Sequence, residues 1–78
     1  MDEIHAAGLA FLRESYERWA REVEAVESAA LAAYKRKVDG DLIGMRHYMR
    51  HAREMMRLLN VDITELSDEI AVYMLKFY

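Results

Sequence analysis

The chain of 78 residues contains no cysteine and no proline, and it has only three glycines. Without cysteine it cannot be a disulfide scaffold, a cysteine-ligated zinc finger or an enzyme with a thiol nucleophile. No apolar run approaches the roughly 18–20 residues of a membrane span, and no signal-peptide pattern is present. Because 54% of the residues are hydrophobic, the composition is also too apolar for a disordered chain. We therefore expect one helical domain over residues 1–78, located in the cytoplasm.

Two breaks divide the sequence into three predicted helices. The Asp-Gly pair at 39–40 predicts a tight turn, and Asp41 can cap the helix that follows. Asn60 suits the left-handed end of a helix, and Asp62 with Glu65 has the spacing of a capping box. The predicted helices cover residues 2–37, 42–59 and 63–77. The expected fold class is all-α, with a long N-terminal helix in an antiparallel hairpin and a shorter third helix.

The first helix carries an apolar seam in which residues recur every seven positions in two series offset by three. The series are Leu9, Tyr16, Val23, Ala30 and Leu12, Trp19, Val26, Ala33. Folded back from the turn, the second helix covers only residues 20–37, so we expect a two-fold homodimer whose long helices pair into a bundle. The predicted dimer interface is Phe11, Leu12, Tyr16 and Trp19. The third helix can either continue along the first or fold back.

Positive charge is concentrated in the middle of the chain. Residues 35–59 hold seven basic and three acidic side chains, whereas the segments on either side are acidic. Four arginines form a stripe along the second helix, at Arg46, Arg50, Arg53 and Arg57. Like charges at this spacing repel each other, so something should offset them. In the hairpin, Glu27 lies level with Arg53 and Glu22 lies level with Arg57, and these acids are the intramolecular candidates.

The tip of the hairpin is the predicted partner-binding site. Its basic residues are Lys35, Arg36, Lys37, Arg46 and Arg50. Such a patch can bind an acidic protein surface, and nucleic acid is the alternative ligand for the same tip. The aromatic residues Phe77 and Tyr78 are predicted to be apolar anchors for the partner, or else to dock into the dimer itself.

A weaker pattern is His47, His51 and Glu54, which share one helix face and can ligate a divalent transition metal. The alternative is that these histidines are ordinary exposed or interface residues. The sequence has no Gly-rich phosphate loop and no serine in a nucleophile-elbow context. The leading hypothesis is therefore a non-catalytic protein–protein interaction module without a cofactor, acting as an adaptor, regulator or inhibitor. A nucleic-acid-binding protein and a metal-binding bundle are the alternatives.

Overall fold

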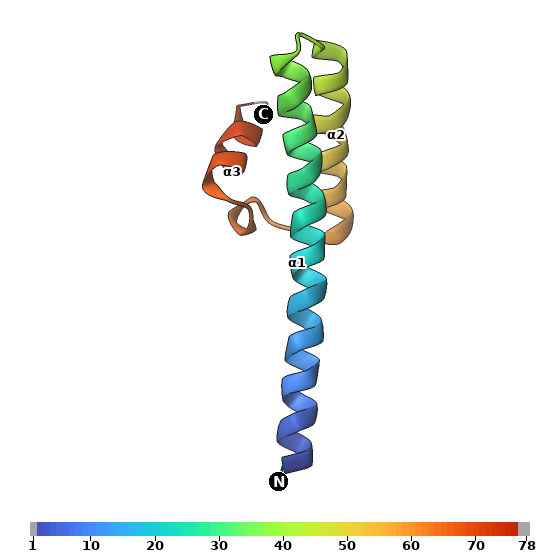
Figure 1. Ribbon diagram of the computed structural model, residues 1–78, viewed down its shortest axis with the longest axis vertical. Coiled ribbons are helices and arrows are strands. Elements are labelled where there is room, and N and C mark those ends of the chain that lie inside the picture. The colour runs from blue at the N-terminus through green and yellow to red at the C-terminus, as the bar shows by residue number, and fades with distance from the viewer. Residues whose placement is uncertain (1, 77–78) are drawn as a thin grey trace.

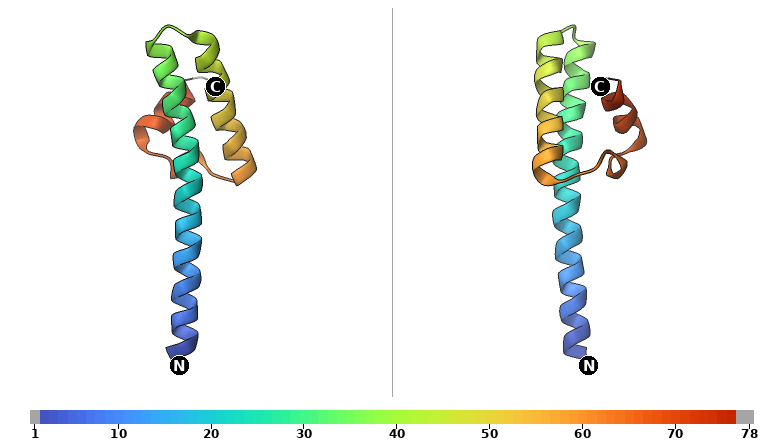
Figure 2. Two further views of the ribbon diagram at one scale, coloured as in Figure 1. Left: turned by 45° about the vertical axis from the view of Figure 1, so that its right-hand side comes forward. Right: turned by 180° about the vertical axis from the view of Figure 1, so that it is seen from behind.

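The computed structural model describes the backbone of residues 2–76 and the side chains of residues 8–76. Its elements are α1 (Asp2–Val38), α2 (Leu42–Leu59), a short 3₁₀ turn η1 (Ile63–Glu65) and α3 (Asp68–Leu75). No strand occurs within residues 2–76, so the predicted all-α class is confirmed. Helices α1 and α2 form an antiparallel hairpin, and α3 folds back beside α1 (Figure 1). The long free part of α1 extends beyond both, as the side views confirm (Figure 2).

The hairpin turn and the helix ends form as the sequence predicts. Gly40 has a φ of 81°, which only glycine adopts readily, and the Asp41 carboxylate accepts a hydrogen bond of 2.8 Å from the backbone N–H of Gly44. A side chain at position 44 would collide with that carboxylate. The other carboxylate oxygen of Asp41 lies 3.7 Å from the Arg36 guanidinium. Helix α2 ends at Asn60, whose φ of 56° is left-handed as expected.

The predicted third helix over residues 63–77 is wrong in its first five residues. The Glu65 carboxylate does accept from the backbone N–H of Asp62 at 2.8 Å, but this cap starts the 3₁₀ turn η1 and not an α-helix. The chain then extends at Leu66, with ψ of 162°, and buries that side chain in the core. The backbone N–H of Ser67 donates to the Glu27 carboxylate at 2.9 Å, and α3 begins at the next residue.

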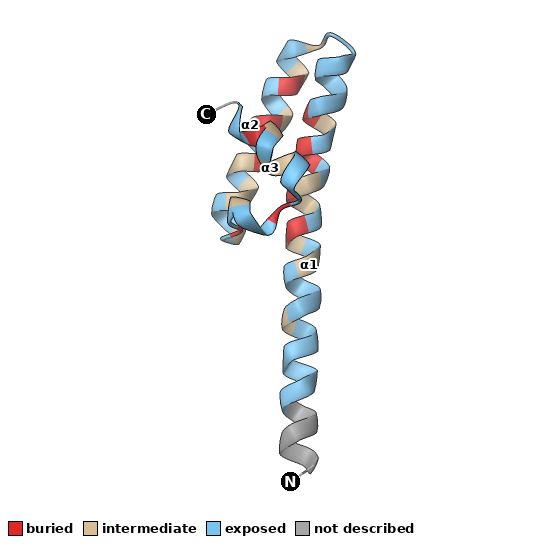
Figure 3. Ribbon diagram, turned by 90° about the vertical axis from the view of Figure 1, so that its left-hand side faces the viewer, coloured by how far each residue is buried: buried red, intermediate tan, exposed pale blue. Residues whose placement is uncertain are grey.

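A small core lies where α1, α2 and the folded-back C-terminal segment meet. Its buried residues are Val23, Val26, Ala29, Ala30, Ala33, Met45, Met49, Ala52, Val61, Leu66 and Met74. The alanines let the helices approach closely, and the flexible methionines fill the remaining gaps. Among the α1 residues whose side chains are described, from residue 8 onward, the buried ones run from Val23 to Ala33, so the hairpin covers the half of α1 next to the turn (Figure 3).

We expect Met74→Ala to lower the free energy of unfolding by about 2–4 kcal/mol, because it leaves a cavity beneath α3. The Met74 side chain is fully buried, whereas Val72 on the same helix is 55% exposed. Val72→Ala is therefore the matched control and should change stability by less than about 0.5 kcal/mol. Urea denaturation followed by circular dichroism measures both. Equal effects of the two substitutions would mean that α3 is not seated on the hairpin.

Candidate functional site

The free half of α1 carries an exposed apolar surface, here called the N-terminal stripe. It consists of Leu9, Phe11, Leu12, Tyr16 and Trp19. Four of these side chains are 54–66% exposed, and Trp19 is 39% exposed. The Tyr16 and Trp19 rings contact each other at 5.7 Å between centroids. The structure thus places all four predicted interface residues on the part of α1 that extends beyond α2, which is mostly exposed (Figure 3).

Trp19 lies at the border between the free and the covered halves of α1. Its indole N–H donates to the Glu65 carboxylate at 3.1 Å, and the other oxygen of the same carboxylate receives the backbone N–H of Asp62. One acid therefore joins α1 to the turn that precedes α3. The sequence analysis missed this contact, since it placed Trp19 in the dimer interface alone. The partners are 46 residues apart, and the only sequence signal was an acid at the start of the third segment.

The arginines of α2 line two adjoining hollows, which together are called the arginine channel. The first has a volume of about 240 Å³ and is lined by Arg46, Met49, Arg50 and Arg53. The second, of about 790 Å³, shares Arg50 and Arg53 and continues to the end of α2. Its further lining residues are Glu54, Met56, Arg57, Asn60, Val61 and Asp62. Three of the four arginines are exposed residues, while Arg53 is half-buried. The stripe predicted from spacing therefore lines two shallow, open hollows along α2.

The predicted basic patch at the hairpin tip is divided. Lys35 and Arg36 line a different hollow, together with Tyr48, whose ring centroid is 5.7 Å from the Arg36 guanidinium. The Lys37 ammonium lies 5.8 Å from the ring centroid of Tyr73 on α3. These two cations are engaged with aromatic rings within the chain. Of the five predicted residues, Arg46 and Arg50 alone line the arginine channel. The predicted anchors Phe77 and Tyr78 lie outside the described residues.

The acid that pairs with Arg57 is Glu54, one turn away on α2, and not Glu22 as expected. The hydrogen bond from Arg57, reinforced by its charge, lowers the pKa of the Glu54 carboxyl below its ordinary value. The Glu27 carboxylate accepts from the backbone N–H of Ser67. Local geometry explains the change in the Arg57 partner, because residues three apart on a helix are already neighbours.

The predicted metal ligands are not gathered into a site. Within the part of the chain that the structure describes, no group of three or more histidines and acids is placed to hold a metal ion. His47 and His51 are both exposed, and the His47 ring packs edge-on against Tyr48 at 5.4 Å between centroids. The Glu54 carboxylate accepts a hydrogen bond from Arg57. The arrangement is that of surface histidines.

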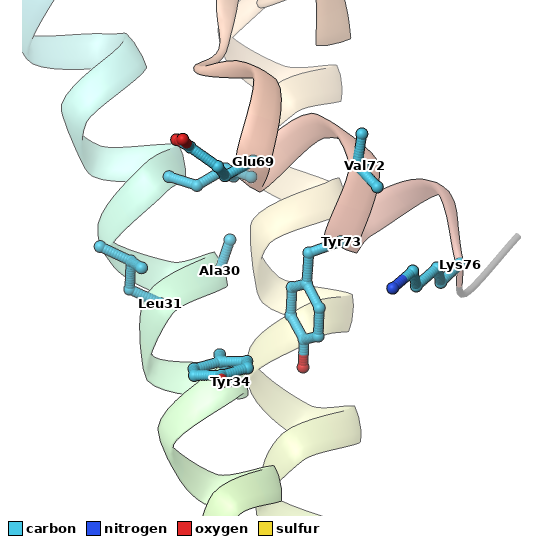
Figure 4. A pocket seen from close by; sticks show the side chains of 8 residues that line it. Ala30, Leu31, Tyr34, Glu69, Val72, Tyr73 and Lys76 are labelled. Carbon is cyan, nitrogen blue, oxygen red and sulfur yellow. The ribbon is translucent and has the colours of Figure 1, made fainter.

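A further hollow of about 300 Å³ lies between α1 and α3 (Figure 4). Leu31 and Tyr34 line it from α1, and Val72 and Tyr73 line it from α3. The two tyrosine rings meet edge to face at 5.5 Å between centroids. Burial, with a smaller contribution from Tyr34, raises the pKa of the Tyr73 hydroxyl. Most of its lining is apolar, so the chemistry this hollow offers is packing.

Comparison with models of known families, with curated proteins and with solved structures gives no match for this chain. Within residues 2–76, no helix combines the length and the apolar character needed to cross a bilayer. The argument for function therefore rests on the two surfaces described above, the N-terminal stripe and the arginine channel.

We expect Arg57→Gln to raise the pKa of Glu54 toward its ordinary value, because the substitution removes the positive charge that lowers it. NMR titration of the Glu54 side-chain carbonyl carbon measures the shift. Arg46→Gln is the control, because Arg46 lies about two turns from Glu54 on the same helix. It should leave the pKa of Glu54 unchanged. A Glu54 pKa that is identical with and without Arg57 would show that the pair is not formed in solution.

Proposed function

We propose that the protein is a non-catalytic protein–protein interaction module that works as a homodimer, with the N-terminal stripe as the contact between copies. The observation that carries the proposal is the exposure of Leu12 and Tyr16, which are 62% and 64% exposed at core positions of the heptad seam. A seam of this kind is complementary to another helix with the same seam. The same repeat already packs against α2 at Val26 and Ala33, which are fully buried.

The size of the stripe supports a helical partner. Aromatic side chains cover about 150–250 Å² each, so the stripe leaves on the order of 500 Å² of apolar surface open in each copy. The largest apolar patch on a typical monomeric protein is about 300–600 Å² and is often functional, so the stripe has the size of a contact surface. Two such surfaces together reach about 1,000 Å², the lower bound for a specific interface. A free helix of about this length is also marginal in water without packing.

The charges around the stripe favour a second copy as its occupant. Residues 8–22 contain three arginines and three glutamates, so this segment is neutral while the whole chain has a net charge of −3. All six lie outside the two heptad series, where they remain solvated and do not repel an identical helix. Self-association through this segment therefore buries apolar surface with little electrostatic cost.

An antiparallel arrangement fits these residues better than a parallel one. In a parallel pair, the two hairpins would lie side by side at the same end of the paired helices. In an antiparallel pair centred near Glu14, Leu12 of one copy meets Tyr16 of the other. The two hairpins then lie at opposite ends of the paired helices. A bundle of this form is the homodimer expected from the sequence.

The proposed role is that of an adaptor, regulator or inhibitor, because a dimer presents its partner-binding surface twice. The proposed setting is the cytoplasm, since nothing in the fold depends on a disulfide. Catalysis has no part in the proposal, because both surfaces offer contact and charge, and neither pairs a nucleophile with a base.

We expect the double variant Leu12→Gln with Tyr16→Gln to be monomeric, because it places amides at the centre of the seam. Sedimentation equilibrium at tens of micromolar should give twice the chain mass of 9.2 kDa for the parent protein and a single chain mass for the variant. Weakening by about 100-fold or more corresponds to at least about 2.7 kcal/mol. Emission from Trp19, the only tryptophan, should shift to the red on dissociation.

The control is Ile43→Gln with Leu58→Gln, which removes two exposed apolar side chains from α2. Ile43 is 84% exposed and Leu58 is 69% exposed, and both lie outside the N-terminal stripe. This control should remain dimeric. A parent protein that sediments as a monomer at the same concentration would refute the proposed homodimer.

The orientation predicts a cross-linking pattern in this cysteine-free chain. Mixing a Leu12→Cys chain with a Tyr16→Cys chain should give a disulfide-linked dimer of the two different chains under mild oxidation. Leu12→Cys alone should cross-link slowly, because its two copies lie about one helical turn apart along the paired helices. Non-reducing gel electrophoresis with mass spectrometry reads the result. Rapid cross-linking of Leu12→Cys to itself would indicate a parallel pair.

A further inference from the structure

We propose that the arginine channel binds an acidic helix of another protein, in which carboxylates alternate with apolar residues. This inference rests on the proposed function as an interaction module, and it names the chemistry of the partner. It concerns α2 and not the N-terminal stripe. The surface that pairs the two copies and the surface that captures a partner are therefore different parts of the chain.

The positive charge of the channel is larger than the negative charge of the acids beside it. Within residues 8–76, no carboxylate lies within ion-pair distance of Arg46 or Arg50. The two guanidinium groups are one helical turn apart, where like charges repel each other. At the other end of the channel, Arg57 is already paired with Glu54. The excess charge is thus localised at the end of α2 nearest the hairpin turn, in the hollow of about 240 Å³.

Part of the lining of the channel is apolar. Met49 lines the hollow between the arginines and is only 3% exposed, and Met56 lines its continuation and is half-buried. Methionine adapts its flexible thioether to different apolar shapes. A surface lined by exposed arginines and by partly apolar side chains matches a helix that presents acidic and apolar positions in turn.

The spacing of the arginines defines the partner further. From Arg46 to Arg57 the stripe extends about 16 Å along α2, which is about three helical turns. Carboxylates three or four residues apart on the partner helix would face Arg46 and Arg50, and each arginine can bind a carboxylate through two parallel hydrogen bonds. Leucine or methionine between those acids would contact the aliphatic stems of the arginines.

Nucleic acid fits the same surface less well. A phosphate backbone carries a charge at every nucleotide, whereas Glu54 and Asp62 line the far end of this channel. The whole chain has a net charge of −3, which repels a long polyanion. Discrete carboxylates at one end of a helix match a channel whose excess positive charge is also at one end.

The experiment measures fluorescence anisotropy with three fluorescein-labelled probes in about 50 mM salt, where charge contacts are weakly screened. The first is a helical 12-residue peptide with glutamate at every third or fourth position and leucine between. The second is the same peptide with glutamine in place of glutamate. The third is a 12-nucleotide single-stranded DNA. We expect the acidic peptide to bind at least about tenfold more tightly than either of the others.

Arg46→Gln with Arg50→Gln should weaken binding of the acidic peptide by about tenfold or more, and should leave thermal stability unchanged. Arg18→Gln with Arg21→Gln is the control with the same change in net charge, located on the free half of α1, and should bind within about twofold of the parent. Arg50→Lys keeps the charge but loses the paired hydrogen bonds, so an intermediate affinity is expected.

Three results would overturn the proposal. They are no binding of the acidic peptide at about 500 µM, equal weakening by the two double variants, or tighter binding of the DNA than of the peptide. Repeating the titration with the Leu12→Gln, Tyr16→Gln chain separates this proposal from dimerisation. Because the channel lies within one copy, that chain should keep its affinity for the peptide even if it is a monomer, and lost affinity there would contradict the location assigned to the site.

Discussion

The structure depends on a difference in length between two paired helices. Helix α1 has 37 residues and α2 has 18, so an antiparallel hairpin covers only the half of the apolar seam that is next to the turn. The hydrophobic repeat nevertheless continues along α1 with the same period into the uncovered half. Because burial of such a repeat is the main source of helix stability in water, the uncovered half is the part of α1 that lacks this stabilisation within one copy. The folded-back α3 leaves this half open.

The sequence predicted most of the fold because its signals are local. The Asp-Gly pair at 39–40, the capping role of Asp41 and the left-handed Asn60 each act within a few residues, and each appears in the structure as expected. The position of the turn, with the length of the second helix, also predicted which half of α1 is buried. The break between η1 and α3 could not be predicted in this way. It depends on Leu66 entering the core and on Ser67 reaching Glu27, which is 40 residues away.

The candidate surfaces were predicted only in part, for the same reason. Spacing placed Arg46, Arg50, Arg53 and Arg57 on one face, and that face is the arginine channel. The sequence analysis grouped Lys35, Arg36 and Lys37 with these arginines because all lie near the turn. In the structure, their side chains contact aromatic rings or line another hollow. Side-chain direction around a helix decides which cations share a surface, and proximity in the sequence does not. Likewise, His47 and His51 share a face of α2, but no third ligand joins them among the described residues.

The Glu65 carboxylate binds two parts of the chain that are far apart in the sequence. One of its oxygens receives the Trp19 indole on α1, and the other receives the backbone of Asp62 at the start of the turn that leads to α3. A partner that turns or covers the Trp19 ring therefore also acts on the cap that positions the C-terminal segment. By thermodynamic linkage, a change that stabilises the packing of that segment also stabilises the same arrangement of the Trp19 ring, by an equal free energy. The contact between Trp19 and Glu65 therefore connects the border of the free part of α1 to the segment that leads to α3 through one exposed hydrogen bond.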